Sequence, residues 1–329
     1  MGADAWRVLR VCVLAPEWVE PWLDRFYDLS DRELVLSLQD RPQKAAEVRE
    51  RQGCRQAELV RAWQRGVLAW SADDLLCPAD FHVRFDHWAM FEGWKDLPHA
   101  IKDRLNKWEL EQYLAAHAEE VEALRSGRPP QAERIIPRYL LLEESLEIID
   151  LAERVFLWPC NCRSMLGKCS KPVFTCLRFD NAGGVGWEIS REKAKDVIQE
   201  ANRAGLMQSG ELGLDAEGRL AGAICNCCSD CCFPHLLADA VQAEKLWPKT
   251  RYLASINRDL CSGCGRCARR CPFQALTLTK AAHDETREIV FSEAICRGCG
   301  LCATGCPEQA ISMRSLDVGP GWDMRDLLG

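Results

Sequence analysis

The chain has 329 residues, of which 47% are hydrophobic and 28% charged, and its formal net charge is −7. This composition is typical of a globular protein long enough for two or three domains. The acidic balance and the lack of a long basic run argue against a nucleic-acid-binding protein. No apolar stretch approaches the ~20 residues of a membrane-spanning helix, and the first residues lack the pattern of a secretion signal. We therefore expect a cytoplasmic protein.

Residues 1–155 are expected to be mostly helical. The stretch "KAAEVRERQGCRQAELVRAWQRGVLAW" has apolar residues at helical spacing, with natural stops at Gly53 and Gly66. Helices followed by a short hairpin over "GVLAWSADDLLC" resemble a winged-helix unit, which covers roughly residues 30–85.

A winged-helix unit can read DNA through basic residues on one helix. The candidates here are Arg55, Arg61 and Arg65. Because Glu58 lies among them and the chain is acidic, a docking or structural domain is the stronger interpretation.

A group of polar side chains follows the hairpin. His82, Asp86 and His87 have the side-chain types of a metal site, but a hydrogen-bonded structural pair is the stronger interpretation.

The twenty cysteines are spread unevenly along the chain. Only Cys12, Cys54 and Cys77 precede residue 160, and they are expected to be small buried hydrophobic residues. The others lie between residues 160 and 306. Disulfides are rare in the cytoplasm, so this concentration indicates metal or redox chemistry. With the predicted elements it indicates an α+β protein of three domains, over residues 1–155, 156–250 and 251–329.

The middle region, residues 156–250, opens with "WPCNCRSMLGKCSKPVFTC" and ends near "ICNCCSDCCFPH". Between them we expect a helix with Ser190 as its N-cap and Gly205 just past its end. A hairpin turning at residues 215–218 should follow. This hairpin returns the chain, so the two groups of cysteines can meet.

Nine cysteines of the middle region are candidate metal ligands. They are Cys160, Cys162, Cys169, Cys176, Cys225, Cys227, Cys228, Cys231 and Cys232. Disulfides between adjacent cysteines would be strained, whereas adjacent side chains that point to opposite sides suit two neighbouring iron–sulfur clusters. Nine thiols suffice for two four-iron clusters with one left over. A larger cluster, a cluster with an open iron and a zinc site remain alternatives.

Residues 251–313 contain an internal repeat. "INRDLCSGCGRCARRCPFQALTL" aligns with "FSEAICRGCGLCATGCPEQAISM" at an offset of 35 residues, and each copy has the pattern C-x2-C-x2-C-x3-C-P. The pattern closely resembles that of bacterial two-cluster ferredoxins, in which the fourth cysteine of each run ligates the other cluster. The resemblance implies a pseudo-twofold domain with two [4Fe-4S] clusters.

The same resemblance implies two ligand sets. One is Cys261, Cys264, Cys267 and Cys306; the other is Cys296, Cys299, Cys302 and Cys271. The glycines of the runs would let backbone amides approach the cluster sulfurs. These are Gly263, Gly265, Gly298 and Gly300.

Residues 155–313 as a whole resemble 4Fe-4S ferredoxin-like multi-cluster proteins of anaerobic bacteria and archaea, which share the "PCNCR" and "ICNCC" blocks. The resemblance implies cofactors and electron transfer but no substrate. The leading hypothesis is an electron carrier or oxidoreductase subunit that links a redox donor to a partner enzyme. It would use two ferredoxin clusters and two more in the middle region.

Two other functions are alternatives to this hypothesis. One is a reductase with a catalytic open-site cluster in the middle region, where Asp230 or His235 would act as spare ligand or proton donor. The other is a redox-sensing regulator with the winged-helix-like unit as its output. No catalytic residue is assigned.

Overall fold

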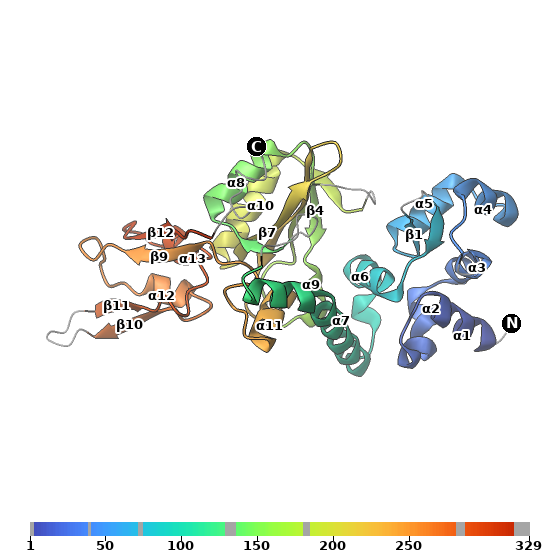
Figure 1. Cartoon of the computed structure of the whole chain (residues 1–329), viewed down its shortest axis with the longest axis horizontal. Coiled ribbons are helices and arrows are strands. Elements are labelled where there is room, and N and C mark those ends of the chain that lie inside the picture. Colours follow the sequence, from blue (N-terminus) through green and yellow to red (C-terminus); the bar gives the residue numbers. More distant parts are fainter. Residues whose placement is uncertain are drawn as a thin grey trace. The chain divides into compact units, whose positions relative to one another are not determined.

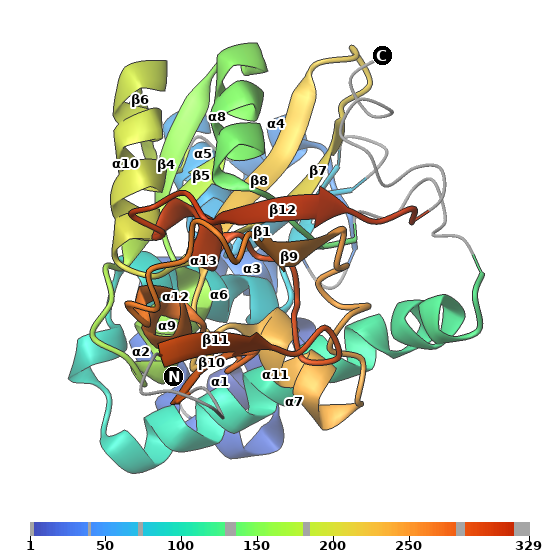
Figure 2. The same cartoon turned by 90° about the vertical axis from the view of Figure 1, so that its left-hand side faces the viewer.

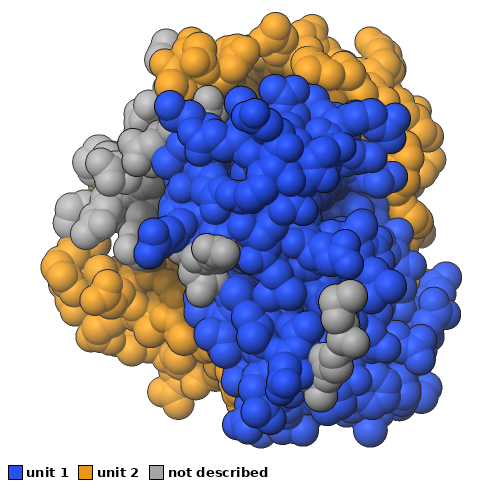
Figure 3. All heavy atoms as spheres, turned by 90° about the vertical axis from the view of Figure 1, so that its right-hand side faces the viewer, with its two compact units in different colours: residues 1–109, 182–185 blue, residues 110–181, 186–329 orange. Residues whose placement is uncertain are grey.

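The computed structural model describes residues 3–38, 41–71, 75–128, 136–179, 185–280 and 287–318. The chain divides into two compact units (Figure 3). Unit 1 consists of residues 1–109 and 182–185, and unit 2 of residues 110–181 and 186–329. Helices and strands are both abundant, which confirms the α+β class. The domain boundaries near residues 155 and 250 stay predictions.

Unit 1 is built from short helices and one hairpin (Figure 1). In chain order these are α1 (Ala3–Cys12), η1 (Glu17–Trp22), α2 (Leu23–Phe26), α3 (Leu29–Leu38), α4 (Ala45–Gln52), α5 (Gln56–Gln64), β1 (Leu68–Trp70), β2 (Leu76–Pro78), α6 (Phe81–Phe91) and η2 (Trp94–Asp96). The glycine stops are confirmed: α4 ends before Gly53, which is left-handed, and α5 ends before Gly66, also at positive φ. The long helix α7 (His99–Arg125) follows.

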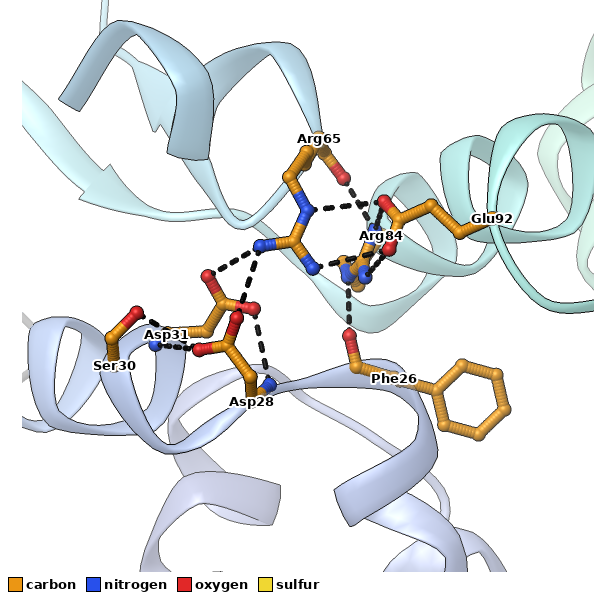
Figure 4. A network of polar contacts seen from close by, with 7 residues as sticks. All are labelled: Phe26, Asp28, Ser30, Asp31, Arg65, Arg84 and Glu92. Carbon is orange, nitrogen blue, oxygen red and sulfur yellow. Dashed lines mark hydrogen bonds and ion pairs between the residues drawn. The ribbon is translucent and has the colours of Figure 1, made fainter. Parts of the chain in front are cut away.

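An aromatic cluster and one ionic network hold unit 1 together. Phe26 contacts the rings of Phe81, Phe85 and Trp88. Next to this cluster, the fully buried Arg84 donates two hydrogen bonds of 2.7 Å to the Glu92 carboxylate (Figure 4). Such a bidentate pair holds Glu92, which caps the C-terminal end of α6, to a residue of the same helix.

The same network reaches α5 and α3. Arg65 contacts both Glu92 and Asp31, and Arg84 donates to the carbonyls of Phe26 and Arg65 (Figure 4). The network therefore ties the end of α5 to the start of α3 and to α6.

Unit 2 contains a six-stranded antiparallel sheet with the order β3-β7-β8-β5-β4-β6. Its strands are β3 (Arg138–Tyr139), β4 (Val155–Pro159), β5 (Phe174–Arg178), β6 (Trp187–Ile189), β7 (Met207–Leu214) and β8 (Leu220–Cys227). The associated helices are α8 (Leu142–Leu151), α9 (Asn161–Leu166), α10 (Arg191–Arg203) and α11 (Phe233–Ala240). Helices α8 and α10 lie beside the strands of the sheet (Figure 2). Their apolar residues form one buried core with residues of the sheet.

The local signals of this region act as expected. The Ser190 hydroxyl accepts a hydrogen bond from the Lys193 amide and caps α10, and Gly205 has positive φ after the helix ends. The β7–β8 hairpin turns at Asp215–Gly218, where the Asp215 carboxylate accepts the Glu217 and Arg219 amides. The hairpin carries Cys225 and Cys227 back toward the first cysteines of the region.

The C-terminal part of unit 2 repeats itself. Its elements are β9 (Tyr252–Ile256), α12 (Arg266–Arg270), β10 (Leu276–Lys280), β11 (Arg287–Phe291), α13 (Leu301–Thr304) and β12 (Ile311–Ser315). β9 pairs with β12 and β10 pairs with β11, both antiparallel (Figure 2). Each strand pair thus joins a strand from one half of the repeat to a strand from the other, so the two halves interlock.

Candidate iron–sulfur centres

Cysteines from the two runs of the repeat lie near one another, while the two ligand sets stay predictions. Cys261, Cys264, Cys267 and Cys306 line one small cavity, so the fourth cysteine of the second run joins the first three of the first run. In the other half, Cys271 interacts electrostatically with Cys299 and Cys302.

Backbone amides support the two crossing thiols in the same way. The Ala275 amide donates to the Cys271 sulfur and the Ala310 amide to the Cys306 sulfur, each at 3.3 Å. Backbone amides that donate to ligating sulfurs are a common feature of iron–sulfur sites. Burial raises the pKa of Cys299 to about 12. A bound cluster would have to supply the positive charge that these thiolates need.

One glycine in each cysteine loop of the repeat lets that loop pack against a strand. Gly263 and Gly298 have φ of 64° and 73°. An added Cβ would lie 2.3 Å from the Arg287 carbonyl oxygen at the first site and 2.2 Å from that of Tyr252 at the second. Since the atoms in the way are backbone, only glycine fits.

Six thiols of the middle region form one continuous group, called here the six-thiol group: Cys160, Cys162, Cys176, Cys225, Cys227 and Cys232. Electrostatic interactions link Cys160 to Cys176, Cys176 to Cys225, and Cys225 to Cys227. Cys227 in turn lies 3.3 Å from Cys232, sulfur to sulfur. Cys162, on α9, interacts electrostatically with Cys160, Cys176 and Cys227.

The remaining three thiols form a separate set, called here the three-thiol group. The Cys169 sulfur lies 3.7 Å from that of Cys228 and 3.8 Å from that of Cys231, and all three sulfurs lie within 4.8 Å of one another. Cysteines that are adjacent in the sequence therefore belong to different groups. Cys227 and Cys232 belong to the six-thiol group, and Cys228 and Cys231 to the three-thiol group. For Cys227, the last residue of β8, this is the separation expected of neighbours in an extended chain, whereas Cys231 lies in a turn.

Arg163 carries positive charge near both groups. It is 2% exposed and interacts electrostatically with Cys160, Cys176 and Cys228. Its guanidinium donates to the carbonyls of Pro172 and Asn226, which fix its place. Arg163 was not among the predicted site residues, although it stands within the "PCNCR" block directly after Cys162.

The charges around Cys228 favour its thiolate. Burial opposes ionisation, but the amides of Cys231 and Asp230 and the Arg163 guanidinium outweigh it and lower the Cys228 pKa. In contrast, burial and the nearby Cys228 raise the pKa of Cys231 to about 12. Two buried sets of thiols fit soft metal centres, and Arg163 offsets part of their negative charge.

Asp230 and His235 are engaged elsewhere. Asp230 is exposed and accepts a hydrogen bond from the Ser229 hydroxyl. His235 is 1% exposed, and burial lowers its pKa to about 4. Its Nδ1 donates to the Cys228 carbonyl at 3.1 Å, and its Nε2 accepts from the Tyr139 hydroxyl at 3.0 Å. Both ring nitrogens are thus hydrogen-bonded rather than directed at a sulfur.

One buried cluster connects the repeat to the middle region. Cys299, from the second run, packs together with Cys227 and Cys232 of the six-thiol group around Tyr139 and Met207. A thiol of the ferredoxin-like part and two thiols of the six-thiol group therefore share one apolar environment within unit 2.

A cavity of about 630 Å³ opens beside this cluster. Its lining includes His235, Phe273 and Arg297. In the sequence, Phe273 stands two positions after Cys271, and Arg297 directly follows Cys296. Arg297 is ion-paired with Asp239 at 2.7 Å and stacks on the Phe273 ring.

The remaining candidates lie in unit 1. Arg65 belongs to the ionic network of Figure 4, and Arg55 is paired with Glu58.

Cys12, Cys54 and Cys77 are half-buried, so the expectation that they are buried was wrong. Potential ligand atoms of His82, Asp86 and Glu109 lie within 4.8 Å of one another, and His87 is not part of this group. His82 Nε2 lies 2.7 Å from the Glu109 carboxylate.

The repeat, its interlocked hairpins and its crossed cysteines define a ferredoxin-like iron–sulfur domain. Residues 260–310 match the family model described as a 4Fe-4S dicluster domain. With its many further cysteines, the chain is an iron–sulfur protein of the electron-transfer class. Comparison with curated proteins and with solved structures gave no match. None of the helices in the described ranges has the length and apolar character to cross a membrane.

Proposed function

We propose that the chain is a cytoplasmic electron carrier, or the electron-carrying subunit of an oxidoreductase, with four iron–sulfur clusters. Two [4Fe-4S] clusters would occupy the repeat. The first would be held by Cys261, Cys264, Cys267 and Cys306, and the second by Cys296, Cys299, Cys302 and Cys271. The crossed grouping of these thiols and the amides directed at Cys271 and Cys306 support this assignment.

Two further clusters would occupy the middle region, one in the six-thiol group and one in the three-thiol group. The support is that both sets consist of sulfur donors, the ligands of iron–sulfur clusters. Zinc would be the competing metal.

The observation that carries the proposal is the packing of Cys299 with Cys227 and Cys232. Electrons pass efficiently only between centres that lie close together. Because these three thiols belong to one buried cluster, the second ferredoxin cluster and a cluster in the six-thiol group would lie near each other. The chain would then conduct electrons between the repeat and the middle region.

The winged-helix-like unit would serve as the docking surface for a redox partner. Its order of helices followed by a hairpin, and the bridge between Gln43 and Leu76, support a winged-helix comparison. Two of the three arginines that would read DNA are paired with carboxylates inside the unit. Protein docking is therefore favoured over DNA binding and over a regulatory role.

Electron paramagnetic resonance of the reduced holoprotein tests the proposal. Neighbouring reduced clusters are paramagnetic and broaden each other's signals. In the wild-type protein we expect the ferredoxin signals to show this interaction. In a Cys227→Ser, Cys232→Ser variant only the interaction between the two repeat clusters should remain, with about eight irons still in the repeat. A Cys77→Ser variant is the control, and a wild-type spectrum identical to that of the double variant would contradict the proposal.

The cavity beside Phe273 favours a second candidate, an iron–sulfur reductase. Its volume of about 630 Å³ is in the range of small-molecule sites, and it adjoins segments that carry cysteines of both regions. Arg297 and Lys245 offer cationic groups at its wall. Reoxidation of the reduced protein by small carboxylate-bearing acceptors would then saturate with acceptor concentration and weaken in a Lys245→Ala variant.

A further inference from the structure

The two halves of the repeat differ in what covers their cysteine loops. Cys299 and Leu301 of the second half are buried in the same cluster as two thiols of the six-thiol group. At an offset of 35 residues, the first half has Cys264 and Arg266 in these positions, and both are exposed. The second loop therefore packs against the middle region, whereas its equivalent in the first half, called here the open loop (residues 258–269), faces solvent.

The exposed thiol of the open loop belongs to the first proposed ligand set. Cys264 lines the small cavity that Cys261, Cys267 and Cys306 also line. Four cysteines around one cavity fit the donor set of a four-iron cluster. Electrons pass efficiently only over short distances, so a redox partner must come close to the centre with which it reacts. The open loop is the place where a partner can do so from solvent.

The two halves also differ in charge. Residues 255–280 contain five cationic side chains and one acidic one, whereas residues 290–315, their equivalents in the second half, contain two of each. Arg266 stands where the second half has Leu301, and Arg269 where it has Thr304. The surplus of positive charge therefore belongs to the first half, and two arginines of α12 contribute to it.

Both arginines lie close to the exposed thiol. Arg266 lines the cavity together with Cys264, and the Arg269 guanidinium lies 3.4 Å from the Cys264 carbonyl oxygen. The Arg266 amide, which hydrogen-bonds to the Cys264 sulfur, and the charges of both arginines lower the pKa of this thiol. Glu308 also lines the cavity and offsets part of the positive charge. The guanidinium groups are exposed and can bind the carboxylates of a partner.

An apolar side chain accompanies these cations. Leu260 directly precedes Cys261 and is 52% exposed. Arginine is enriched in protein–protein interfaces, and the buried centre of such an interface is apolar. The open loop offers both kinds of contact, and its cations favour a partner with complementary negative charge.

We propose that the open loop is a docking surface for a redox protein whose own docking face is acidic. The inference rests on the proposed function, because it requires a cluster in the first ligand set. It adds a second docking surface to that of the winged-helix-like unit and specifies the charge of the partner. One electron would pass from the reduced protein to this partner, so the protein is oxidised as the partner is reduced.

Electron transfer from the reduced full-length holoprotein to two carrier proteins of opposite charge tests the inference, with stopped-flow spectrophotometry as the readout. Flavodoxin is the acidic acceptor and cytochrome c the basic one. With flavodoxin, we expect the second-order rate constant to fall as salt is added, because salt screens the attraction. At low salt it should be about tenfold lower in an Arg266→Gln, Arg269→Gln variant, as expected when electrostatic steering is lost. With cytochrome c, the same variant should not be slower.

Two further variants are controls. Arg7→Gln, Lys193→Gln removes the same charge from exposed positions outside the repeat and should leave the flavodoxin rate unchanged. Arg266→Lys, Arg269→Lys retains the charge and should retain the rate. A rate as low as that of the glutamine variant would contradict a role of charge.

A flavodoxin rate that is independent of salt, or that falls equally in both glutamine variants, would overturn the inference. An equal loss of rate with cytochrome c would also overturn it, because electron transfer itself would then be impaired. Total iron separates these failures from that of the proposed function. About sixteen irons with a salt-independent rate would contradict the inference alone, whereas about eight irons would contradict only the four-cluster proposal, since docking requires only the first ligand set to be filled.

Discussion

Arg84 and Glu92 form a bidentate ion pair in unit 1. Replacing Arg84 with methionine leaves Glu92 with one cationic partner and the Phe26 carbonyl without its donor. Because removal of one partner of a buried pair typically costs about 3–5 kcal/mol, we expect a loss of about 3 kcal/mol in the free energy of unfolding of unit 1. Chemical denaturation of the holoprotein measures this.

Arg55 is the matched control for Arg84. It also pairs with a glutamate, Glu58, but its side chain is 83% exposed. Exposed pairs contribute about 0–1 kcal/mol, so Arg55→Met should change stability by less than about 1 kcal/mol. Equal effects of the two substitutions would show that the Arg84 network does not hold the helices together.

His82 makes the stability of unit 1 depend on pH. Its hydrogen bond to Glu109 raises the pKa of the imidazole to about 9. The charged form is favoured in the folded state, so the stabilisation is complete below the unfolded pKa of about 6.5 and is lost as pH rises through about 9. Thermal unfolding between pH 6 and pH 10 should show this decline in the wild type and a weaker one in Glu109→Gln. Parallel curves for the two proteins would refute the assignment.

At the level of elements, the cysteine loops depend on their glycines. Gly298 and Gly218 have similar φ, 73° and 77°, but only at Gly298 would a Cβ meet backbone atoms. Alanine at Gly218 should cost only the left-handed penalty of about 1–2 kcal/mol. Alanine at Gly298 should in addition distort the second cysteine loop and lower the iron content by about four per chain. Iron analysis of both variants checks this, and equal iron contents would contradict it.

Several elements could be predicted because their signals are local. The serine cap of α10, the turn at Asp215 and the glycine stops of α4 and α5 depend on residues close in sequence. The repeat was predictable because identical spacing at an offset of 35 residues builds identical loops. Adjacent cysteines were expected to face different sites because side chains alternate along a strand.

The division of the nine thiols into six and three could not be predicted. It depends on where α9 and the loop carrying Cys169 lie relative to β5 and β8, which spacing does not determine. Arg163 was missed for the same reason. An arginine next to a cysteine in the sequence gives no signal of a site, and only the fold shows that it is buried near both thiol groups. The pairing of Tyr139 with His235 joins residues 96 positions apart, and local patterns carry no signal for it.

At the scale of the whole molecule, cysteine sets follow one another through unit 2. The repeat supplies the two proposed ligand sets, and Cys299 lies in one buried cluster with Cys227 and Cys232 of the six-thiol group. The three-thiol group shares Arg163 with that group, and Cys228 and Cys231 are sequence neighbours of Cys227 and Cys232. A succession of adjacent centres is the arrangement that electron transfer through a single chain requires.

Iron and acid-labile sulfide per chain, measured on anaerobically purified protein together with its Mössbauer spectrum, test the central claim most directly. Four clusters predict about sixteen irons, because each cluster of this class contains four. About eight irons, with zinc bound in the middle region, would contradict the claim. The two thiol groups would then be structural zinc sites beside a ferredoxin-like domain.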